Sequence, residues 1–366
     1  MPQTAKIVAL PGDGVGPDVL AAGLKVLDAA AEAYGLGVDV QTVGCGAQHY
    51  QRHGAEWEEG GLEACREADA SLLGAVGWPG VSLPNGDIAG AGVVFGLRFG
   101  LDLYANVRPC KLYEGVPHRI GDRFTQIWRP DEVDLVLLRE NTEGSYTPTR
   151  GTLSRADVDE MAIDTRVITR KGSLRIHEKA FEIAAGRPDS SVTCIDKANV
   201  RAGCRLFRAC FNEVAANHPD IPTGTQYVDA FTQALMRDPA AFDVGVAPNM
   251  LGDIVTDLAA VLQGGMGMAA SGNIGDHHAV FEPVHGSAPD IAGQNAANPY
   301  AMVQCIQMML NHLAPTHGAR YADAAADVEA ALRSAIQGGA LTPDLGGSAT
   351  TTAAADAVVA ALRAEA

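Results

Sequence analysis

Apolar runs that alternate with helix-like segments are the feature that most constrains how this chain can fold. The first such repeat is an apolar strand at residues 6–10, a glycine turn, and a helix that opens near Pro17 and Asp18 and ends at Gly35. Further strand-like runs lie at residues 38–43, 71–76, 134–138, 163–169 and 192–196, and we expect those at 38–43 and 71–76 to be buried strands. Strands that alternate with helices form mostly parallel sheets whose faces the helices cover. The sequence therefore predicts an α/β fold with a mostly parallel sheet.

Composition narrows the class of protein further. The 366 residues suit two ordinary domains or one large one, and 47% hydrophobic with 19% charged residues is typical of a globular chain. A net charge of −17 argues against binding to nucleic acid or to an anionic membrane. The seven cysteines show no metal-ligand spacing and indicate reduced thiols. Because the sequence has no signal-peptide pattern and no apolar run of membrane length, we expect a cytoplasmic protein.

The glycine turn after the first strand reads Gly12-Asp-Gly-Val-Gly16-Pro17. A dinucleotide-binding G-x-G-x-x-G fingerprint that starts at Gly12 requires glycine at position 17, where this chain has proline. The sequence therefore disfavours a Rossmann fold. It favours a tight strand-to-helix turn near a site.

Two carboxylates stand four residues apart in the stretch Asn249-Met-Leu-Gly-Asp253-Ile-Val-Thr-Asp257. Apolar residues at helical spacing predict a helix here: Leu251, Ile254, Val255, Leu258 and Leu262. Like charges at this spacing repel, and residues 238–319 contain no Lys or Arg to neutralise them. Paired oxygen ligands suit a hard divalent cation such as Mg²⁺ or Mn²⁺. The alternative is an acid in the first helical turn and a second, solvated acid at the surface.

Three arginines sit in apolar contexts at positions 98, 108 and 139. Because a guanidinium binds carboxylates through two parallel hydrogen bonds, Arg98, Arg108 and Arg139 indicate a di- or tricarboxylate ligand. The alternative is three unrelated ion pairs.

Groups suited to proton transfer occur in the same half of the chain. Tyr146 follows the third arginine and is a candidate proton donor. Lys197 follows an apolar strand, and a desolvated lysine has a lowered pKa and can act as a base. The alternative for Lys197 is a surface lysine paired with Asp196. Asp229 is a third candidate carboxylate.

Residues 281–293 form a segment rich in small residues, Phe281-Glu-Pro-Val-His285-Gly-Ser-Ala-Pro-Asp290-Ile-Ala-Gly293. Small side chains allow backbone N–H groups to approach a flat or phosphorylated ligand. The segment is therefore a candidate binding loop.

These features occur in a fixed order, which resembles that of the metal-dependent β-decarboxylating dehydrogenases, namely isopropylmalate, isocitrate, homoisocitrate and tartrate dehydrogenases. The resemblance runs from Lys6 to about Ala361. Eight ordered motifs carry it: LPGDGVGPDV (10–19), LRFGLDLYANVRP (97–109), LRENTEGSY (138–146), IDKANV (195–200), QYVDAF (226–231), NMLGDIVTD (249–257), FEPVHGSAPDIAG (281–293) and TPDLGGSAT (342–350).

The resemblance implies a two-domain, non-Rossmann α/β fold. An outer, NAD-binding domain would comprise residues 1–103 and 264–366. An inner domain, residues 104–263, would carry the dimer contacts and an arm at about 147–165. The protein would be a homodimer in which Lys197 and Asp229 complete the active site of the neighbouring subunit.

The resemblance also implies roles for particular residues. Tyr146 and Lys197 match catalytic residues, Asp229, Asp253 and Asp257 match the Mg²⁺ or Mn²⁺ ligands, and the three arginines match the substrate ligands. The cofactor NAD would be bound by His285, Gly286, Ser287, Ala288, Asp290, Asn298 and Asp344. NAD is expected over NADP, because Asp290 accepts a bond from the ribose 2′-OH and repels a 2′-phosphate.

The residues before Arg98 bear on the substrate. In this family they contact the group on C3 of a malate core, and here they are Val93, Val94 and Phe95. An apolar C3 group is therefore expected, and a 3-isopropylmalate-like substrate is favoured. Isocitrate, homoisocitrate, tartrate, D-malate or another 3-alkylmalate stays open, because the ENTEG run (140–144) and Ala91 differ from the usual isopropylmalate pattern. A metal-free reductase and an inactive NAD-binding paralogue are the remaining alternatives.

Overall fold

The structure is a computed structural model that describes residues 4–156 and 158–365. The chain divides into two compact units. The first is Met1–Leu103, Lys111–Asp131 and Ala260–Ala366, and the second is Tyr104–Cys110 and Glu132–Ala259. The sequence placed 111–131 and 260–263 in the inner domain, whereas these segments pack within the first unit. There Lys111 pairs with Glu329, and His118 binds the Leu262 carbonyl oxygen.

Five strands form the sheet of the first unit, in the order β13-β14-β3-β1-β2. Their bounds are β1 Ala5–Gly12, β2 Val38–Thr42, β3 Ala70–Ala75, β13 Ala270–Ile274 and β14 Ala279–Pro283. β1 pairs in parallel with β2 and β3, β3 pairs in parallel with β14, and β13 and β14 are antiparallel. The expectation of a buried strand at 38–43 is wrong for β2, because β2 is an edge strand whose residues are partly or fully exposed.

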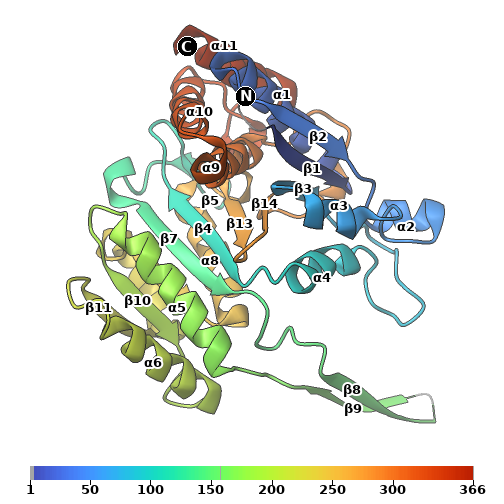
Figure 1. Cartoon of the computed structure of the whole chain (residues 1–366), viewed down its shortest axis with the longest axis vertical. Coiled ribbons are helices and arrows are strands. Elements are labelled where there is room, and N and C mark those ends of the chain that lie inside the picture. Colours follow the sequence, from blue (N-terminus) through green and yellow to red (C-terminus); the bar gives the residue numbers. More distant parts are fainter. Residues whose placement is uncertain (1–3, 157, 366) are drawn as a thin grey trace. The chain divides into compact units, whose positions relative to one another are not determined.

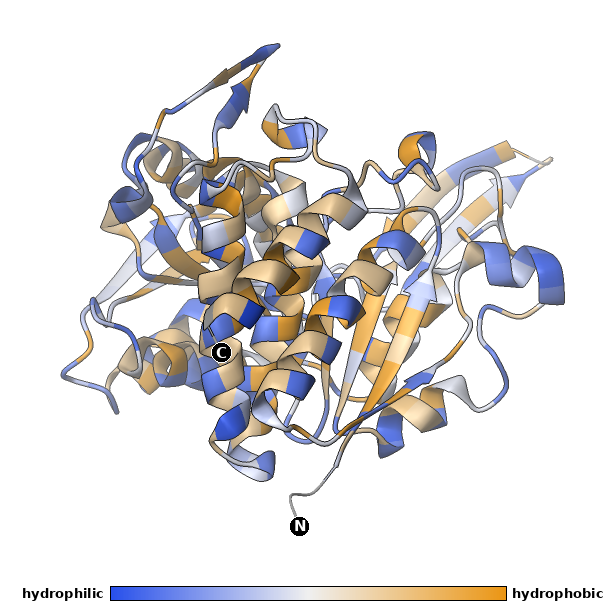
Figure 2. Ribbon diagram, turned by 90° about the horizontal axis from the view of Figure 1, so that it is seen from above, coloured by the Kyte–Doolittle hydropathy of each residue, from blue (hydrophilic) through white to orange (hydrophobic). Residues whose placement is uncertain are grey.

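Helices pack on this sheet and on one another: α1 Gly16–Tyr34, α2 Ala47–His53, α3 Gly61–Glu67, α4 Ala91–Gly100, α9 Tyr300–His317, α10 Arg320–Gln337 and α11 Thr351–Glu365. α1 has Pro17 in its first turn and ends at Gly35, whose φ of 60° is left-handed, as the sequence predicts. Figure 1 shows α1, α9, α10 and α11 gathered beside the strands of this unit. The strands are mainly hydrophobic, and the helices carry polar residues on one side (Figure 2).

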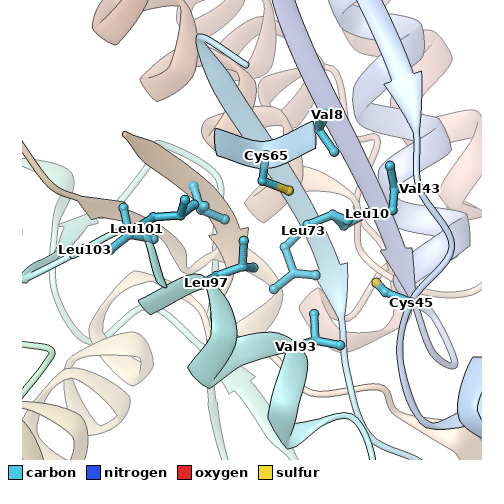
Figure 3. Packing of buried hydrophobic residues seen from close by; sticks show 11 residues of the cluster. Val8, Leu10, Val43, Cys45, Cys65, Leu73, Val93, Leu97, Leu101 and Leu103 are labelled. Carbon is cyan, nitrogen blue, oxygen red and sulfur yellow. The ribbon is translucent and has the colours of Figure 1, made fainter. Parts of the chain in front are cut away.

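A hydrophobic cluster fixes α4 to the sheet (Figure 3). Val93 and Leu97 of α4 are 0% and 2% exposed and pack with Leu10 of β1 and Leu73 of β3. Removing a buried leucine from such a cluster costs about 2–5 kcal/mol. The cluster therefore fixes which face of α4 remains available for ligands.

The sheet of the second unit has the order β11-β10-β12-β7-β4. Its strands are β4 Ala105–Lys111, β7 Asp134–Glu140, β10 Val192–Asp196, β11 Thr223–Tyr227 and β12 Val244–Ala247. β10 is parallel to β11 and β12, and β12 is parallel to β7. The helices of this unit are α5 Arg170–Ala185, α6 Ala202–Ala215, α7 Val228–Arg237 and α8 Asn249–Ala260. The predicted mostly parallel α/β architecture is confirmed in both units.

An antiparallel hairpin of β8 (Arg150–Arg155) and β9 (Val158–Asp164) lies within the expected arm (Figure 1). All the residues of its two strands are exposed, including four large apolar side chains, Leu153, Val158, Met161 and Ile163. The expected strand at 163–169 is wrong beyond Asp164, because Thr169 caps α5 by accepting a hydrogen bond from the Gly172 N–H.

Short elements complete the fold. They are β5 (His118–Ile120), β6 (Arg123–Thr125), and the 3₁₀ turns η1 Pro130–Glu132, η2 Pro239–Ala241, η3 Val261–Gln263, η4 Met266–Met268, η5 Pro289–Ile291 and η6 Pro343–Leu345. Over the part of the chain that the structure describes, no helix has the length and apolar character needed to span a membrane.

Candidate active site

Asp253 and Asp257 lie one turn apart on α8, as the sequence predicts. The helix begins at Asn249, so Asp253 belongs to its second turn and is not the first-turn acid of the alternative interpretation. The side chains of Asp253 and Asp257 are 29% and 53% exposed. The pair is therefore open to solvent and requires compensating charge.

Arginines from two neighbouring strands supply that charge. Arg108 of β4 places Nη1 2.8 Å from Asp257 Oδ1 and Nη2 3.4 Å from Asp253 Oδ1. Arg139 of β7 pairs with the same oxygen of Asp253 through Nη1. The side chain of Arg139 is only 2% exposed. Arg108 and Arg139 therefore belong to one cluster and are not unrelated ion pairs.

Further hydrogen bonds orient the two guanidinium groups. Asn249 Oδ1 accepts from Arg139 Nε and Nη2 at 3.0 and 2.8 Å, and Asn106 Oδ1 accepts from Arg108 Nε at 2.7 Å. Gly252 lets α8 approach β7 closely, since a Cβ there would lie 2.7 Å from Arg139 Cβ. The arginine orientations are thus set by packing and by neutral partners as well as by the aspartates.

Tyr146 completes the cluster. Its hydroxyl donates to Asp253 Oδ2 at 2.6 Å, and the Arg139 guanidinium lies over its ring at 5.0 Å. The structure thus unites five residues named from the sequence, which we call the aspartate–arginine cluster: Arg108, Arg139, Tyr146, Asp253 and Asp257.

Lys197 and Asp229 form a separate pair in the same unit. Lys197 Nζ lies 2.5 Å from Asp229 Oδ1 in the first turn of α7, and this hydrogen bond lowers the pKa of the Asp229 carboxyl. Asp196, the alternative partner of Lys197, is instead bound by Arg208 through two hydrogen bonds of 2.7 Å. The Asp229 side chain is 65% exposed, so this pair lies at the surface of the unit.

The donor chemistry of α8 fits a divalent cation in part. Two carboxylates on one helix face offer the hard oxygen ligands that Mg²⁺ and Mn²⁺ prefer. Among the described residues, however, no three His, Cys, Asp or Glu side chains come together in a group suited to a metal ion. A single described chain therefore presents two of the three expected ligands together, and Asp229 stands apart from them.

Arg98 lies near the end of α4 in the first unit. Its Nη2 is 3.8 Å from Glu282 Oε1, and its buried Nε finds no partner among the residues described. Val93 points into the hydrophobic cluster, so it is a core residue and not a candidate ligand contact. Val94 is partly buried against the same cluster, and the ring of Phe95 stacks on Phe99 at 5.9 Å.

Glu56 is a residue that sequence reasoning missed. Its Oε1 accepts hydrogen bonds from the backbone N–H groups of Gly90 and Gly92, on either side of Ala91. A carboxylate at the N-terminus of a helix is stabilised by the helix dipole. Glu56 therefore holds the start of α4, but no local motif distinguishes it from neighbouring acids.

A cavity of about 350 Å³ lies in the first unit. We call it the first-unit pocket. Its lining residues are Val15, Arg119, Gly267, His285, Ala288, Ile291, Ala296, Ala297, Asn298, Pro343 and Asp344. Four predicted cofactor residues thus come together from three separate segments. Sequence reasoning missed Val15 and Arg119.

Three other predicted cofactor residues flank the pocket without lining it. Gly286 and Asp290 are exposed, and the Ser287 carbonyl oxygen accepts the Val15 N–H at 2.8 Å. Gly14 permits this approach of the glycine turn, because its φ is +61° and a Cβ there would lie 1.9 Å from Ser287 O. The turn that fails as a dinucleotide fingerprint therefore packs against the candidate binding loop.

The pocket contains polar groups that can form hydrogen bonds with a bound ligand. Asn298 Nδ2 donates to Asp344 Oδ2 at 3.0 Å. His285 donates from Nδ1 to the Gly286 carbonyl oxygen at 3.0 Å, and its buried Nε2 has no partner among the described residues. Burial lowers the pKa of His285 and favours the neutral imidazole. A mainly apolar cavity with a few polar groups is typical of small-molecule sites.

The fold and these two sites define a class of protein. Residues 6–359 match the isocitrate/isopropylmalate dehydrogenase family, and the chain belongs to that family of oxidoreductases.

Individual relatives are similar over nearly the whole chain. A 3-isopropylmalate dehydrogenase of Thermobifida fusca is 41% identical over 340 residues, which cover 92% of each chain. One of Corynebacterium glutamicum is 39% identical and covers 98% of this chain and 99% of its own. The crystal structure of isocitrate dehydrogenase from Methylococcus capsulatus superposes with a TM-score of 0.86 at 36% identity, covering 98% of this chain and 100% of its own. The expected family and its non-Rossmann fold are confirmed.

Proposed function

We propose that this protein is an NAD-dependent and Mg²⁺- or Mn²⁺-dependent dehydrogenase that oxidises and decarboxylates a 3-alkylmalate to a 2-oxo acid, CO₂ and NADH. The aspartate–arginine cluster is the observation that carries the proposal. It combines two buried guanidinium groups, a tyrosine hydroxyl and two metal-type carboxylates within hydrogen-bonding distance of one another. The relatives named 3-isopropylmalate dehydrogenase support the substrate class.

Arg108 and Arg139 bind the substrate carboxylates in this proposal. Both are almost fully buried, and both have guanidinium N–H groups directed at carboxylate oxygens. Hydrogen bonds to the neutral side chains of Asn106 and Asn249 keep the two guanidinium groups oriented when the aspartates bind the metal ion. Arg98, whose buried Nε has no partner among the described residues, is proposed as the third carboxylate ligand.

The divalent cation would be held by Asp253 and Asp257 together with Asp229 of the partner subunit. When bound, it supplies Lewis-acid chemistry, polarising oxygens of the substrate and stabilising negative charge that develops on them. This assignment accounts for a third carboxylate that is exposed and remote from the α8 pair within its own subunit.

The protein's own side chains move the protons. Lys197 of the partner subunit accepts the hydroxyl proton directly or through a hydroxyl group or water, and bound NAD would supply the acceptor for the hydride that leaves C2 of the substrate. The resulting 2-oxo acid carries a carboxylate β to its carbonyl, and that carboxylate leaves as CO₂ with its bonding electrons retained on the substrate. Tyr146 then donates its proton to C3, which completes the balance of the reaction.

The substrate's C3 group is proposed to be apolar because Val94 and Phe95 of α4 offer no charge and no hydrogen-bond donor from their side chains. Burying an additional carboxylate against them without a partner costs several kcal/mol. Each buried methylene gains about 0.8 kcal/mol instead. A 3-isopropylmalate-like substrate is therefore favoured.

The ENTEG run does not alter this preference, because its side chains build a turn. Glu140 is 2% exposed, and its carboxylate accepts hydrogen bonds from the Thr142 N–H and hydroxyl and from the Glu143 N–H. Burial raises the pKa of Glu140. The carboxyl is thus engaged in local structure, and the run is a weak argument for a tartrate- or isocitrate-type substrate.

A homodimer with shared sites is part of the proposal. The arm exposes four large apolar side chains, and α8 exposes Met250 and Ile254 at 41% and 57% beside the aspartates. Contiguous exposed apolar residues mark protein interfaces. The exposed Lys197–Asp229 pair is then available to a second copy of the chain.

One assay tests the proposal. The protein is incubated with Mn²⁺, NAD and either 3-isopropylmalate, D-malate, tartrate or isocitrate, with and without a chelator, and NADH absorbance is followed. We expect metal-dependent reduction with the highest kcat/KM for 3-isopropylmalate. A clear preference for isocitrate contradicts the apolar pocket, reduction without metal indicates a reductase, and silence across a broad panel indicates an inactive paralogue.

A further inference from the structure

We propose that Arg119 binds the phosphate-bearing part of the dinucleotide in the first-unit pocket and is its principal electrostatic anchor. This inference rests on the proposed NAD function and adds a residue that neither the motifs nor the comparisons assign. Arg119 lines the pocket together with Asp344, Asn298 and His285. Among the described residues that line the pocket, it is the only lysine or arginine.

The charge distribution of the chain makes this position unusual. Residues 238–319, which supply Gly267, His285, Ala288, Ile291 and Asn298 to the pocket, contain no Lys or Arg. The chain carries a net charge of −17, and the polar lining includes a carboxylate and an imidazole whose lowered pKa favours the neutral form. A dinucleotide brings a doubly negative diphosphate into this environment. Arg119 is the group placed to compensate it.

The hairpin that carries Arg119 is held firmly within the first unit. His118, its neighbour in β5, is fully buried, donates from Nε2 to the Leu262 carbonyl oxygen at 2.9 Å, and accepts the Ile127 N–H at Nδ1 at 3.2 Å. Phe124 of β6 packs over Gly346, where a Cβ would lie 2.9 Å from the ring. Gly346 follows Pro343 and Asp344, so the hairpin is fixed against the same segment that lines the pocket.

The Arg119 side chain itself is only lightly engaged. Its Nε donates to the Gly121 carbonyl oxygen at 3.4 Å, and its guanidinium carbon lies 5.9 Å from the centre of the Phe124 ring. Long contacts of this kind leave most of the five N–H donors available to an anion. Guanidinium groups bind phosphate through paired, charge-assisted hydrogen bonds. The backbone of Arg119 is therefore held in place by the hairpin, while its guanidinium group remains available to bind an anion.

The experiment measures binding of adenosine, AMP, ADP-ribose, NAD and NADP by isothermal titration calorimetry to the full-length parent protein and to Arg119→Gln and Arg119→Lys. Arg123→Gln is the matched control, because Arg123 lies on the opposite strand of the same hairpin, is exposed, and is not among the pocket-lining residues. Thermal unfolding of each variant checks that the hairpin change leaves the fold intact.

For Arg119→Gln we expect adenosine affinity to stay within about twofold and ADP-ribose and NAD affinity to fall about tenfold, because a charge-assisted hydrogen bond is lost. The loss should shrink as salt is raised. Arg119→Lys should retain part of the affinity, and Arg123→Gln should match the parent.

Three results overturn the assignment. An equal loss for adenosine and ADP-ribose means that Arg119 stacks on the base and does not bind phosphate. A loss confined to NADP means that it contacts a 2′-phosphate, and equal behaviour of Arg119→Gln and Arg123→Gln removes any specific role. These outcomes differ from failure of the proposed function, in which the parent protein itself binds neither NAD nor ADP-ribose.

Discussion

In the aspartate–arginine cluster of the second unit, Arg108, Arg139, Asp253 and Asp257 all have a partner of opposite charge. The first-unit pocket is lined mainly by apolar side chains, and its charged Asp344 is hydrogen-bonded to a neutral amide. In the proposed reaction, substrate and metal replace ion pairs that already exist between the arginines and aspartates of the cluster. A ligand of the pocket instead fills a preformed cavity. Removing one charge should therefore disrupt the cluster far more than the pocket.

The largest effect is expected for Asp253→Asn. Asp253 accepts hydrogen bonds from Arg108, Arg139 and Tyr146, so the substitution leaves two buried guanidinium groups poorly compensated. Because Asp253 is proposed as a metal ligand, the substitution should also weaken metal binding. We expect kcat/KM to fall more than about a hundredfold. Asp257→Asn, whose side chain is 53% exposed, should be milder, and excess Mn²⁺ should partly restore it.

Steady-state kinetics over a Mn²⁺ titration measure both variants, and direct Mn²⁺ binding separates metal loss from substrate loss. Asp276→Asn is the control, because it removes the same charge from an exposed position outside both sites. Parental Mn²⁺ affinity in both α8 variants would show that the metal assignment is wrong.

The next largest effect tests whether the active site needs Lys197 from a second copy of the chain. Lys197→Ala and Asp253→Asn should each be inactive, and mixing them should restore activity. In a mixed dimer with shared sites, one of the two sites collects no lesion, so random exchange should recover about a quarter of the parental activity. If mass spectrometry confirms subunit exchange and activity stays absent, Lys197 acts within its own subunit.

The residues of the cluster could be predicted from the sequence more completely than the contacts of the first unit, and the reason is physical. Asp253 and Asp257 were predictable as neighbours because helical spacing fixes their separation. Arg108 and Arg139 occupy β4 and β7, which are neighbouring strands of one sheet. Arg119 and Glu56 were not predictable, because each reaches its contacts from a segment distant in sequence. Glu56 binds the N–H groups of residues more than thirty positions away, and no periodic pattern records such a contact.

The fold shows the same division between local and non-local information. Pro17 and Gly35 mark the ends of α1, and the apolar runs mark most of the strands. Whether a strand lies at an edge depends on its neighbours in the sheet, and this is why the partial exposure of β2 was missed. The assignment of 111–131 to the first unit depends likewise on tertiary contacts such as Lys111 with Glu329.

A smaller effect is expected at the rim of the first-unit pocket. Asp290 is exposed beside Ile291, which lines the cavity, so its charge lies where a 2′-phosphate of NADP would be repelled. Asp290→Lys should shift the ratio of kcat/KM for NADP and NAD toward NADP by about tenfold or more. Asp276→Lys controls for the change in net charge. A parent enzyme that already prefers NADP removes this argument.

The smallest effect is expected on the pH dependence of the unfolding free energy. It distinguishes the buried His177, which lies outside both sites, from His285 in the first-unit pocket. His177 of α5 is 0% exposed, and burial lowers its pKa to about 3 while Nε2 donates to the Phe207 carbonyl oxygen at 3.0 Å. Its folded pKa lies below the unfolded value of about 6.5, so the unfolded chain binds the extra proton as pH falls from about 6.5 toward 3, and stability is lost in that window. Between pH 7 and 5.5 the loss should be about 1 kcal/mol.

His177→Gln retains a donor for the Phe207 carbonyl oxygen but cannot titrate, so its unfolding free energy should depend less on pH by that amount. Urea unfolding at the two pH values measures the difference, and His277→Gln, which changes an exposed imidazole, is the matched control. His285 in the first-unit pocket also has a pKa lowered by burial, but NAD is proposed to cover it. Saturating NAD should therefore leave the His177 contribution unchanged. Saturating NAD could instead abolish the difference in pH dependence between the parent and His177→Gln. That result would show that ligand binding in the first-unit pocket changes the stability of the second unit, and it would contradict the contrast drawn between the two regions.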